Sequence, residues 1–222
     1  MPPKAAYHHG DLKAALLAAA LKEIALHGVQ GFSLRGVARR AGVSAPAVYR
    51  HFEDKDALIA AVAIDANQRL REMIGEAVRA APPNPLEQFR ATGIMIVRFA
   101  VAHPEHFRVI SYRGALGSAP AFQLSGPDDD AETRRMIRAA QEAGLMTAGL
   151  SVDEVLLAAN SLVTGLANHI INGRLGKVDD KRATELAKFV TRVLGVGLVP
   201  RDEDYVDGPT ATVIEGRAKK KR

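Results

Sequence analysis

The sequence predicts an all-α fold. Apolar residues recur about three or four positions apart in nearly every segment, which places them on one face of a helix. Leu16, Ala20 and Ile24 are an example of such a row. The pattern of a strand, alternating apolar and polar residues bounded by turns, is hard to find. Stop signals such as Gly42 and Pro82 divide the periodic stretches into separate helices.

The N-terminal part of the chain carries a start or stop signal for each expected helix. Asp11 is expected to cap the first helix and Gly28 to end it. Pro46 fits the first turn of the third helix, because that position needs no backbone N–H. The fourth helix, at about 1.5 Å per residue, is long enough to leave one domain and enter a second. The expected helices are 11–27, one from the Ser33 cap to Gly42, one that begins after Ser44, and one from the Asp54 cap to about residue 80.

The remainder of the chain is expected to form a second, larger helical domain. A stretch over 116–130 is rich in Gly, Pro, Ser and Asp and is expected to be a loop. The chain thus divides into an N-terminal domain over 1–62, a helical domain over 63–199, and a charged tail over 200–222 that is expected to be disordered. The further expected helices are 85–102, 104–114, 131–144, 151–174 and 180–197.

The charge of the chain is unevenly distributed. The net charge is +5, and the five basic residues within 217–222 account for all of it. A local basic patch lies between Leu34 and Phe52, where there is no Asp or Glu. A confined basic patch on an otherwise neutral body predicts contact with a polyanion. The basic residues of this patch are Arg35, Arg39, Arg40 and Arg50.

Several classes of chemistry are not expected. The chain has no cysteine, which excludes disulfides, thiolate nucleophiles and cysteine-based metal sites. The apolar run over 14–21 is much shorter than the roughly 20 residues of a membrane span, so a cytoplasmic protein without a membrane partner is expected. His8 and His9 are adjacent, and His103 and His106 lack the spacing of a helical metal pair. No nucleophile-elbow or phosphate-loop motif occurs, so we expect neither a metal, nor a cofactor, nor an enzyme.

Gly42, Val43 and Ser44 have the arrangement of a helix-turn-helix corner. Glycine ends the first helix in a left-handed conformation, valine fills the corner, and serine caps the second helix. Val48 and Phe52 are one helical turn apart and are expected to point into the core. The other side chains of this segment then face solvent: Ala45, Pro46, Ala47, Tyr49, Arg50 and Glu53.

This outward face suits the major groove of DNA. Small residues at the start of the helix permit close approach, and Tyr49 and Arg50 offer contacts to bases or phosphates. Ser33 and Ser44 each stand at a helix start, where free backbone N–H groups favour a phosphate. The corner by itself fits equally well a helical core motif whose arginines form a solvated face.

The whole string over 31–58, GFSLRGVARRAGVSAPAVYRHFEDKDAL, is far more specific. It resembles the DNA-binding domain of TetR/AcrR-family transcriptional repressors, and the resemblance covers about residues 7–62. The resemblance implies an all-α homodimer with an N-terminal three-helix DNA-binding domain and a C-terminal helical ligand-binding and dimerisation domain. It also implies binding to a palindromic operator on double-stranded DNA and release by a small-molecule effector.

The resemblance assigns roles to single positions. The family's common basic residue and glycine after the serine are replaced here by Ala45 and Pro46, which removes one expected charge. The positions that match DNA-backbone contacts of the family are Ser33, Ser44, Tyr49, His51 and Lys55. The positions that match base contacts are Arg35, Pro46, Tyr49 and Arg50.

The last two long helices are expected to form the dimer interface. Ser151 and Glu154 have the spacing of a capping box at the start of the first. Two such helices per subunit, paired across a two-fold axis, make a four-helix bundle, although packing within one subunit explains the same pattern. The apolar positions concerned are Val155, Ala159, Leu162, Val163, Leu166 and Ile170 on the first helix, and Leu186, Phe189, Val190, Val193 and Leu194 on the second.

A ligand site is expected in the second domain. The segment around Gly165 resembles a family subgroup that usually has Trp-x-x-x-His-Gly, and Asn160 and Thr164 stand at the Trp and His positions. These two share a helix face and offer polar contacts in a pocket or bonds to the backbone. Apolar side chains such as Phe89 and Met136 line a cavity or belong to the core. The candidate ligand contacts are Phe99, Phe107, Tyr112, Asn160 and Thr164.

The expected function is that of a sequence-specific DNA-binding regulator, a repressor that an unidentified small molecule releases from its operator. One alternative is a helical ligand-binding protein whose helix-turn-helix no longer engages DNA. Acidic substitutions on the third helix would mark that alternative, and the segment over 34–52 has none. The other alternative is an activator without operator repression.

Overall fold

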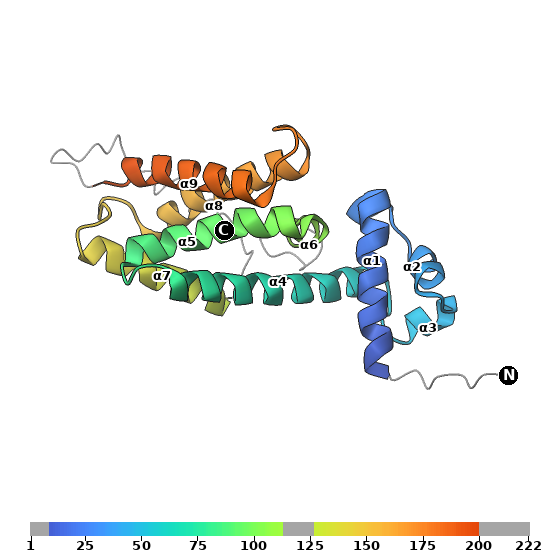
Figure 1. Ribbon diagram of the computed structural model, residues 1–222. Helices are drawn as coiled ribbons and strands as arrows, with labels where there is room; N and C mark the ends of the chain where they lie inside the picture. Colours follow the sequence, from blue (N-terminus) through green and yellow to red (C-terminus); the bar gives the residue numbers. More distant parts are fainter. Residues whose placement is uncertain (1–8, 113–126, 200–222) are drawn as a thin grey trace, which may run out of the picture.

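The computed structural model describes residues 9–112 and 127–199, and these parts of the chain form helices and no strand. This confirms the all-α fold. Figure 1 shows α1 to α3 at one end, joined by the long α4 to a layered group formed by the other helices. The helices are α1 His9–Gly31, α2 Leu34–Ala41, α3 Ala45–Tyr49, α4 Lys55–Ala80, α5 Pro85–Ala102, α6 Pro104–Ile110, α7 Pro127–Glu142, α8 Val152–Ile171 and α9 Asp180–Gly197.

Three of the expected helix starts are confirmed by their hydrogen bonds. The Ser33 hydroxyl accepts from the backbone N–H of Gly36 (3.1 Å) at the start of α2. The Asp54 carboxylate accepts from the N–H of Ala57 (2.7 Å) at the start of α4. Ser151 and Glu154 form the expected capping box at the start of α8. These side chains bond N–H groups that the helices leave free, so the local sequence sets the boundaries.

Some boundaries differ from the expected ones. The first helix begins at His9, so Asp11 lies within it and is not its cap. The helix also runs past residue 27 to Gly31, although Gly28 does interrupt its regular geometry (φ 71°, ψ 169°). α6 ends at Ile110 instead of 114, and α7 begins at Pro127, inside the expected loop. α8 ends at Ile171 instead of 174, because Gly173 adopts a left-handed backbone (φ 72°). His8, the rest of the expected loop and the expected tail lie outside the described residues.

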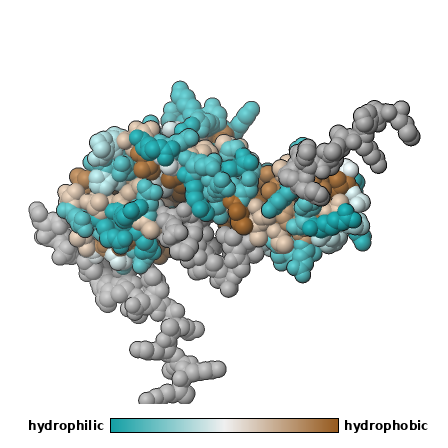
Figure 2. Space-filling view, turned by 90° about the horizontal axis from the view of Figure 1, so that it is seen from below, coloured by the Kyte–Doolittle hydropathy of each residue, from teal (hydrophilic) through white to brown (hydrophobic). Residues whose placement is uncertain are grey.

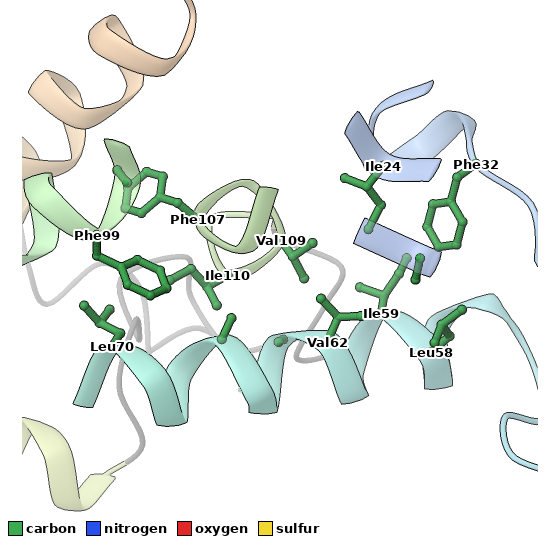
Figure 3. Packing of buried hydrophobic residues seen from close by; sticks show 14 of the residues in the cluster. Ile24, Phe32, Leu58, Ile59, Val62, Leu70, Phe99, Phe107, Val109 and Ile110 are labelled. Atoms are coloured by element: carbon green, nitrogen blue, oxygen red, sulfur yellow. The ribbon is translucent and has the colours of Figure 1, made fainter. Parts of the chain in front are cut away.

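One hydrophobic core runs through both ends of the molecule along α4. Near its start, Leu58 and Ile59 pack in the cluster that contains Ile24 of α1 and Phe32. Further along α4, Leu70 belongs to the same cluster. Figure 3 shows Leu70 beside Phe99, and it places Ile110 and Val109 of α6 between this end of the cluster and the end that contains Ile24. Because these side chains form one contiguous cluster, α4 is mechanically coupled to the N-terminal helices.

The joint between α4 and α6 contains two histidines. His106 Nε2 lies 3.6 Å from the Asp65 carboxylate, and the His103 and His106 rings meet edge to face. Burial lowers the pKa of His106, and His103 and Arg69 lower it further. Burial and then Arg69 also lower the pKa of His103. Both rings are therefore neutral near pH 7, and α6 packs on α4 without added charge.

A second, smaller core lies at the far end of the helical group. Phe89 of α5, Met136 and Ile137 of α7, Met146, and Leu156 of α8 are buried there. α8 is long and apolar enough to span a membrane, by length and composition only. Several of its apolar side chains are instead buried in the two cores, including Val155, Val163 and Leu166. Packing within the protein thus accounts for much of the apolar character of α8.

Candidate nucleic-acid interface and ligand cavity

α2 and α3 form the expected helix-turn-helix. Gly42 adopts the left-handed conformation (φ 70°, ψ 27°), which a side-chain-bearing residue rarely tolerates. The N–H of Val43 then donates to the carbonyl oxygen of Ala38 (3.0 Å) and closes the end of α2. Val48 and Phe52 are buried, as their spacing predicts. The outward face of α3 is fixed by this packing.

The residues expected to contact DNA lie around this unit. Tyr49 is 53% exposed, a high value for an aromatic side chain on a folded domain. The expected contacts are spread along the chain from Ser33, the N-cap of α2, to Lys55, the first residue of α4. The exposed members are Ser33, Arg35, Ser44, Pro46, Tyr49 and Arg50, and the half-buried members are Ala45, His51 and Lys55.

The two serines differ in their hydrogen bonds. The Ser33 hydroxyl caps α2, but Ser44 makes no side-chain cap bond at the start of α3, contrary to expectation. The backbone explains the difference. Pro46 has no N–H, and the N–H of Ala47 donates to the carbonyl oxygen of Ser44 itself (3.0 Å). The exposed Ser44 hydroxyl is therefore not used by its own helix.

The basic patch is smaller than the sequence suggests. The Nε–H of Arg40 donates to Glu23 Oε1 at 2.7 Å, and the Glu23 carboxylate is 4% exposed. Arg40 therefore neutralises a buried carboxylate inside the group formed by α1, α2 and α3, which is called the three-helix unit. Arg35, Arg39 and Arg50 are exposed and form no ion pair with any residue that the structure describes. These three arginines are therefore the part of the basic patch that is open to solvent.

The ion pair between Glu23 and Arg40 was not predicted from the sequence. Glu23 lies on the same helix face as Leu16 and Ala20, both fully buried, so its position pointed to a buried carboxylate. The space around the Glu23 carboxylate is closely defined, because a Cβ added at Gly36 would collide with Glu23 Oε2. Gly36 thus allows α2 to lie directly against the buried ion pair.

Replacing Gly36 with alanine is expected to destabilise the three-helix unit by roughly 1–3 kcal/mol, because the Glu23 carboxylate must move away from Arg40. The matched control is Gly31→Ala, where the nearest atom to the new Cβ is His27 Cβ at 3.5 Å, an ordinary contact. Thermal unfolding of both variants checks this. Equal melting temperatures for the two variants would contradict the packing role of Gly36.

Lys55 serves the fold as well as the surface. Its Nζ donates to the carbonyl oxygen of Gln30 (2.5 Å) and lies 4.7 Å from the centroid of the Phe32 ring. The ammonium group thus ties the start of α4 to the end of α1. An ammonium has three N–H donors, so one can bond Gln30 while another is directed to a phosphate.

Lys55→Ala is expected to weaken DNA binding about equally on every sequence and to reduce the salt dependence by about one unit of slope per lost phosphate contact. It should also lower the melting temperature, because the tie to Gln30 and Phe32 is lost. Lys55→Arg, which keeps the charge, is the control. Anisotropy titrations at several salt concentrations measure both slopes, and a loss confined to one DNA sequence would contradict a phosphate role.

A cavity of about 350 Å³ lies between α4, α5, α7, α8 and α9, within the size range of small-molecule sites. Its wall is mainly apolar and comes from both cores. Leu70, Ile96 and Val163 belong to the larger core, whereas Phe89 and Leu156 belong to the smaller one. The polar and charged side chains that line it are Asn67, Arg71, Arg79, Arg90, Thr92, Glu132, Thr133, Asn160 and Thr191.

Only one of the expected ligand contacts lines this cavity. Asn160 does so, whereas Phe99 and Phe107 are completely buried in the larger core. Tyr112 packs against that core, and Thr164 is half-buried on α8 away from the cavity wall. Phe99 and Phe107 lie there because α6 folds back against α4, a packing that periodicity alone does not reveal. Phe89 and Met136, which also suited a cavity by composition, do line it.

Five large apolar side chains of α8 and α9 are exposed: Leu157, Leu162, Phe189, Val193 and Val196. The last three share one face of α9, and together with Leu162 of α8 they are called the α8–α9 face. The exposed fractions of the five side chains range from 38% to 61%. By contrast, the face seen in Figure 2, which lies on the opposite side from α9, is largely hydrophilic where residues are described. Single exposed apolar side chains are common, but a row along one helix face marks an interaction surface.

Other positions expected in a dimer interface are buried within the subunit. Five of them are at most 9% exposed: Val155, Ala159, Val163, Leu166 and Ile170. Packing within one subunit, the alternative reading of the sequence pattern, therefore applies to this part of α8. Leu162, Phe189 and Val193 remain exposed for a partner.

Comparison with known proteins agrees with this arrangement. The family model described as "Bacterial regulatory proteins, tetR family" matches residues 16–62, which contain the three-helix unit. No curated protein matches the chain. A solved protein of unknown function from Rhodococcus sp. RHA1 is 31% identical over 89% of this chain and 100% of its own, with a TM-score of 0.71.

Regulators of known name share the fold over most of their length. The fatty acid degradation regulator FadR from Bacillus halodurans has a TM-score of 0.70 at 17% identity, covering 85% of this chain and 96% of its own. A TetR family transcription regulator from Marinobacter aquaeolei VT8 has a TM-score of 0.61 at 18% identity, covering 86% and 96%. Residues 16–62, which contain the helix-turn-helix, thus belong to the tetR family of bacterial regulatory proteins, and the chain as a whole shares the helical fold of these solved regulators.

Proposed function

We propose that the protein is a cytoplasmic repressor that binds a palindromic operator as a homodimer and leaves it when a small molecule binds. The observation that carries the proposal is the exposed, acid-free surface of α2 and α3, with Arg35, Tyr49 and Arg50 directed to solvent. Arginine pairs with guanine or phosphate, and α3 is fixed by the buried Val48 and Phe52. Phosphate contacts would come from Ser33, Ser44, His51 and Lys55, with Ala45 and Pro46 close to the bases.

The proposed dimer uses the α8–α9 face. Phe189, Val193 and Val196 are more than half exposed, and a second copy of the same face would cover them across a two-fold axis. Such an arrangement makes a four-helix bundle from α8 and α9 of both subunits. It also presents two copies of α3, as a palindrome requires, at the separation of two successive major grooves, about 34–36 Å.

The proposed route from ligand to DNA is α4. Its second half lines the cavity from Asn67 to Arg79, and its first half carries Leu58 and Ile59 in the core shared with α1. An occupant that favours another position of α4 would move the N-terminal helices and change the spacing of the two α3 helices. The ligand acts by its different affinities for the two positions, which set how far the equilibrium shifts.

Transcription from the protein's own promoter region in a purified system tests the proposal. Added protein is expected to lower the amount of transcript, since a dimer on the operator excludes the polymerase. Tyr49→Ala protein, which keeps the buried core, serves as the control and should repress less. A rise in transcript would make the protein an activator, and no change would remove regulation at that promoter.

A further inference from the structure

The cavity between α4, α5, α7, α8 and α9 has a mainly apolar wall with a few polar groups, and this composition indicates the class of ligand that it can bind. It lies at the boundary between the two hydrophobic cores, so a bound molecule would contact side chains of both cores. Its apolar wall includes Leu70 and Ile96 from one core and Phe89 and Met136 from the other. A wall of this kind favours an apolar body, because burying apolar surface is the main source of affinity in such sites.

Two buried polar atoms at the cavity wall have no hydrogen-bond partner among the described residues. They are Oδ1 of Asn67, a residue only 7% exposed, and Nε of Arg90. Leaving such groups unpaired is costly, and native proteins rarely do so. The Nε–H of Arg90 can only donate, so it requires an acceptor. The amide of Asn67 can accept from, or after rotation donate to, a hydroxyl or carbonyl group.

The charge of Arg90 indicates which kind of acceptor its Nε–H binds best. Arg90 is a cation, and among the described side chains of the cavity wall Arg79 and Glu132 are further charged residues of opposite sign. The Arg90 guanidinium is held in place by its Nη1, which donates to Glu87 Oε1 at 2.7 Å. Its position is therefore set before a ligand arrives. A guanidinium group that is held in this way forms its strongest hydrogen bonds with an anionic acceptor, so the Nε–H of Arg90 favours a carboxylate over a neutral carbonyl group.

The two unpaired atoms lie apart along the bundle. α4 and α5 are antiparallel and are joined by a short turn, so Asn67 and Arg90 are separated by about 12 Å along the helix axes at about 1.5 Å per residue. Leu70 and Ile96 of the cavity wall lie between the levels of Asn67 and Arg90 along the helix axes. An elongated molecule that satisfies both ends therefore needs an apolar chain between two polar groups.

We propose that the cavity binds an elongated amphipathic anion, with its carboxylate or similar anionic group on the Nε–H of Arg90 and its apolar chain between the two cores. A hydroxyl or carbonyl group near the other end of the chain pairs with Asn67. Binding itself follows from the cavity alone, whereas the role of this molecule as the effector rests on the proposed function.

Three ten-carbon probes separate the contributions of the anionic group, the distal hydroxyl group and the apolar chain to the binding free energy. They are decanoate, 10-hydroxydecanoate and 1-decanol, each titrated into the full chain by calorimetry. Decanoate is expected to bind about tenfold more tightly than decanol or better, because a charge-assisted hydrogen bond is gained. The added hydroxyl of 10-hydroxydecanoate is expected to improve binding further, and Asn67→Leu should remove that improvement only. Decanol binding as tightly as decanoate would overturn the proposal.

Arg90→Gln is expected to abolish the preference for decanoate over decanol, while Arg135→Gln, which removes a charge from an exposed residue of α7 outside the cavity wall, should keep it. Arg90→Lys keeps the charge but lacks Nε, and it should lose part of the preference even if the glutamine variant does not fold. Gly195→Leu places a side chain at the cavity wall, where a new Cβ has nothing within 4 Å, and should weaken all three probes.

DNA binding measured on the same samples keeps the two proposals separate. Specific DNA binding without affinity for any probe would overturn the inference about the ligand and leave the DNA-binding function standing. Arg90-dependent binding of decanoate without any specific DNA binding would have the opposite meaning. A preference for decanoate that survives both Arg90 substitutions would overturn the assignment of the anion site.

Discussion

Replacing Phe189 and Val193 together with glutamate is expected to prevent formation of the proposed dimer and, with it, to remove most of the affinity for the proposed operator. Both side chains are more than half exposed on the α8–α9 face and would become buried against the partner. Four carboxylates at one interface would meet without partners, and the cost of burying unpaired charges is several kcal/mol. A monomer contacts one half-site at a time, so the affinity for a palindrome should fall by about 10²–10⁴-fold.

Light scattering after size-exclusion chromatography measures the mass of the particle, and anisotropy measures its affinity for DNA. The matched control is Ile64→Glu, which places a carboxylate on an exposed apolar position of α4 (63% exposed) outside this face. It should leave both the mass and the affinity unchanged. A Phe189/Val193 variant that remains dimeric would show that the two copies meet through another surface.

Replacing Arg35 and Tyr49 together with alanine is expected to abolish recognition of the operator while leaving the fold intact. Both side chains are exposed, and neither pairs with a described residue, so thermal unfolding should be nearly unchanged. Each base contact contributes roughly 1–3 kcal/mol, and a dimer loses every contact twice. The ratio of specific to non-specific affinity should therefore fall by several orders of magnitude.

Competition binding with operator and scrambled DNA measures that ratio. Arg138→Ala is the control, because it removes an exposed charge on α7, far from α2 and α3. Its effect should be small and equal on both DNAs. If the Arg35/Tyr49 variant kept the wild-type ratio, the base-reading face would have to lie elsewhere.

The N-terminal helices and their caps were predictable because local rules determine them. Ser33, Gly42 and Asp54 act through backbone groups within about one turn, and their bonds are as expected. Two caps were exceptions. Ser44 makes no cap bond, since Pro46 and the local backbone leave its hydroxyl no partner in α3. Asp11 is not a cap, because α1 begins at His9.

Long-range packing was not predictable in the same way. Glu23 and Arg40 pair although they are far apart in the sequence, and this contact removes one arginine from the basic patch. Phe99 and Phe107 have the composition of pocket residues, yet the fold of α6 against α4 makes them core. The cavity residues that matter most for the ligand, including Arg90, are ordinary helix positions in the sequence. Their role follows only from how α4, α5 and α8 meet.

The most direct test of the account is a fluorescence anisotropy titration of the full chain on the DNA that flanks its own gene, with scrambled competitor present and the salt concentration varied. We predict tight binding that depends on an inverted repeat and weakens steeply with salt, as expected for a dimer with several phosphate contacts. Weak binding that ignores sequence at every salt concentration would contradict operator recognition at that locus.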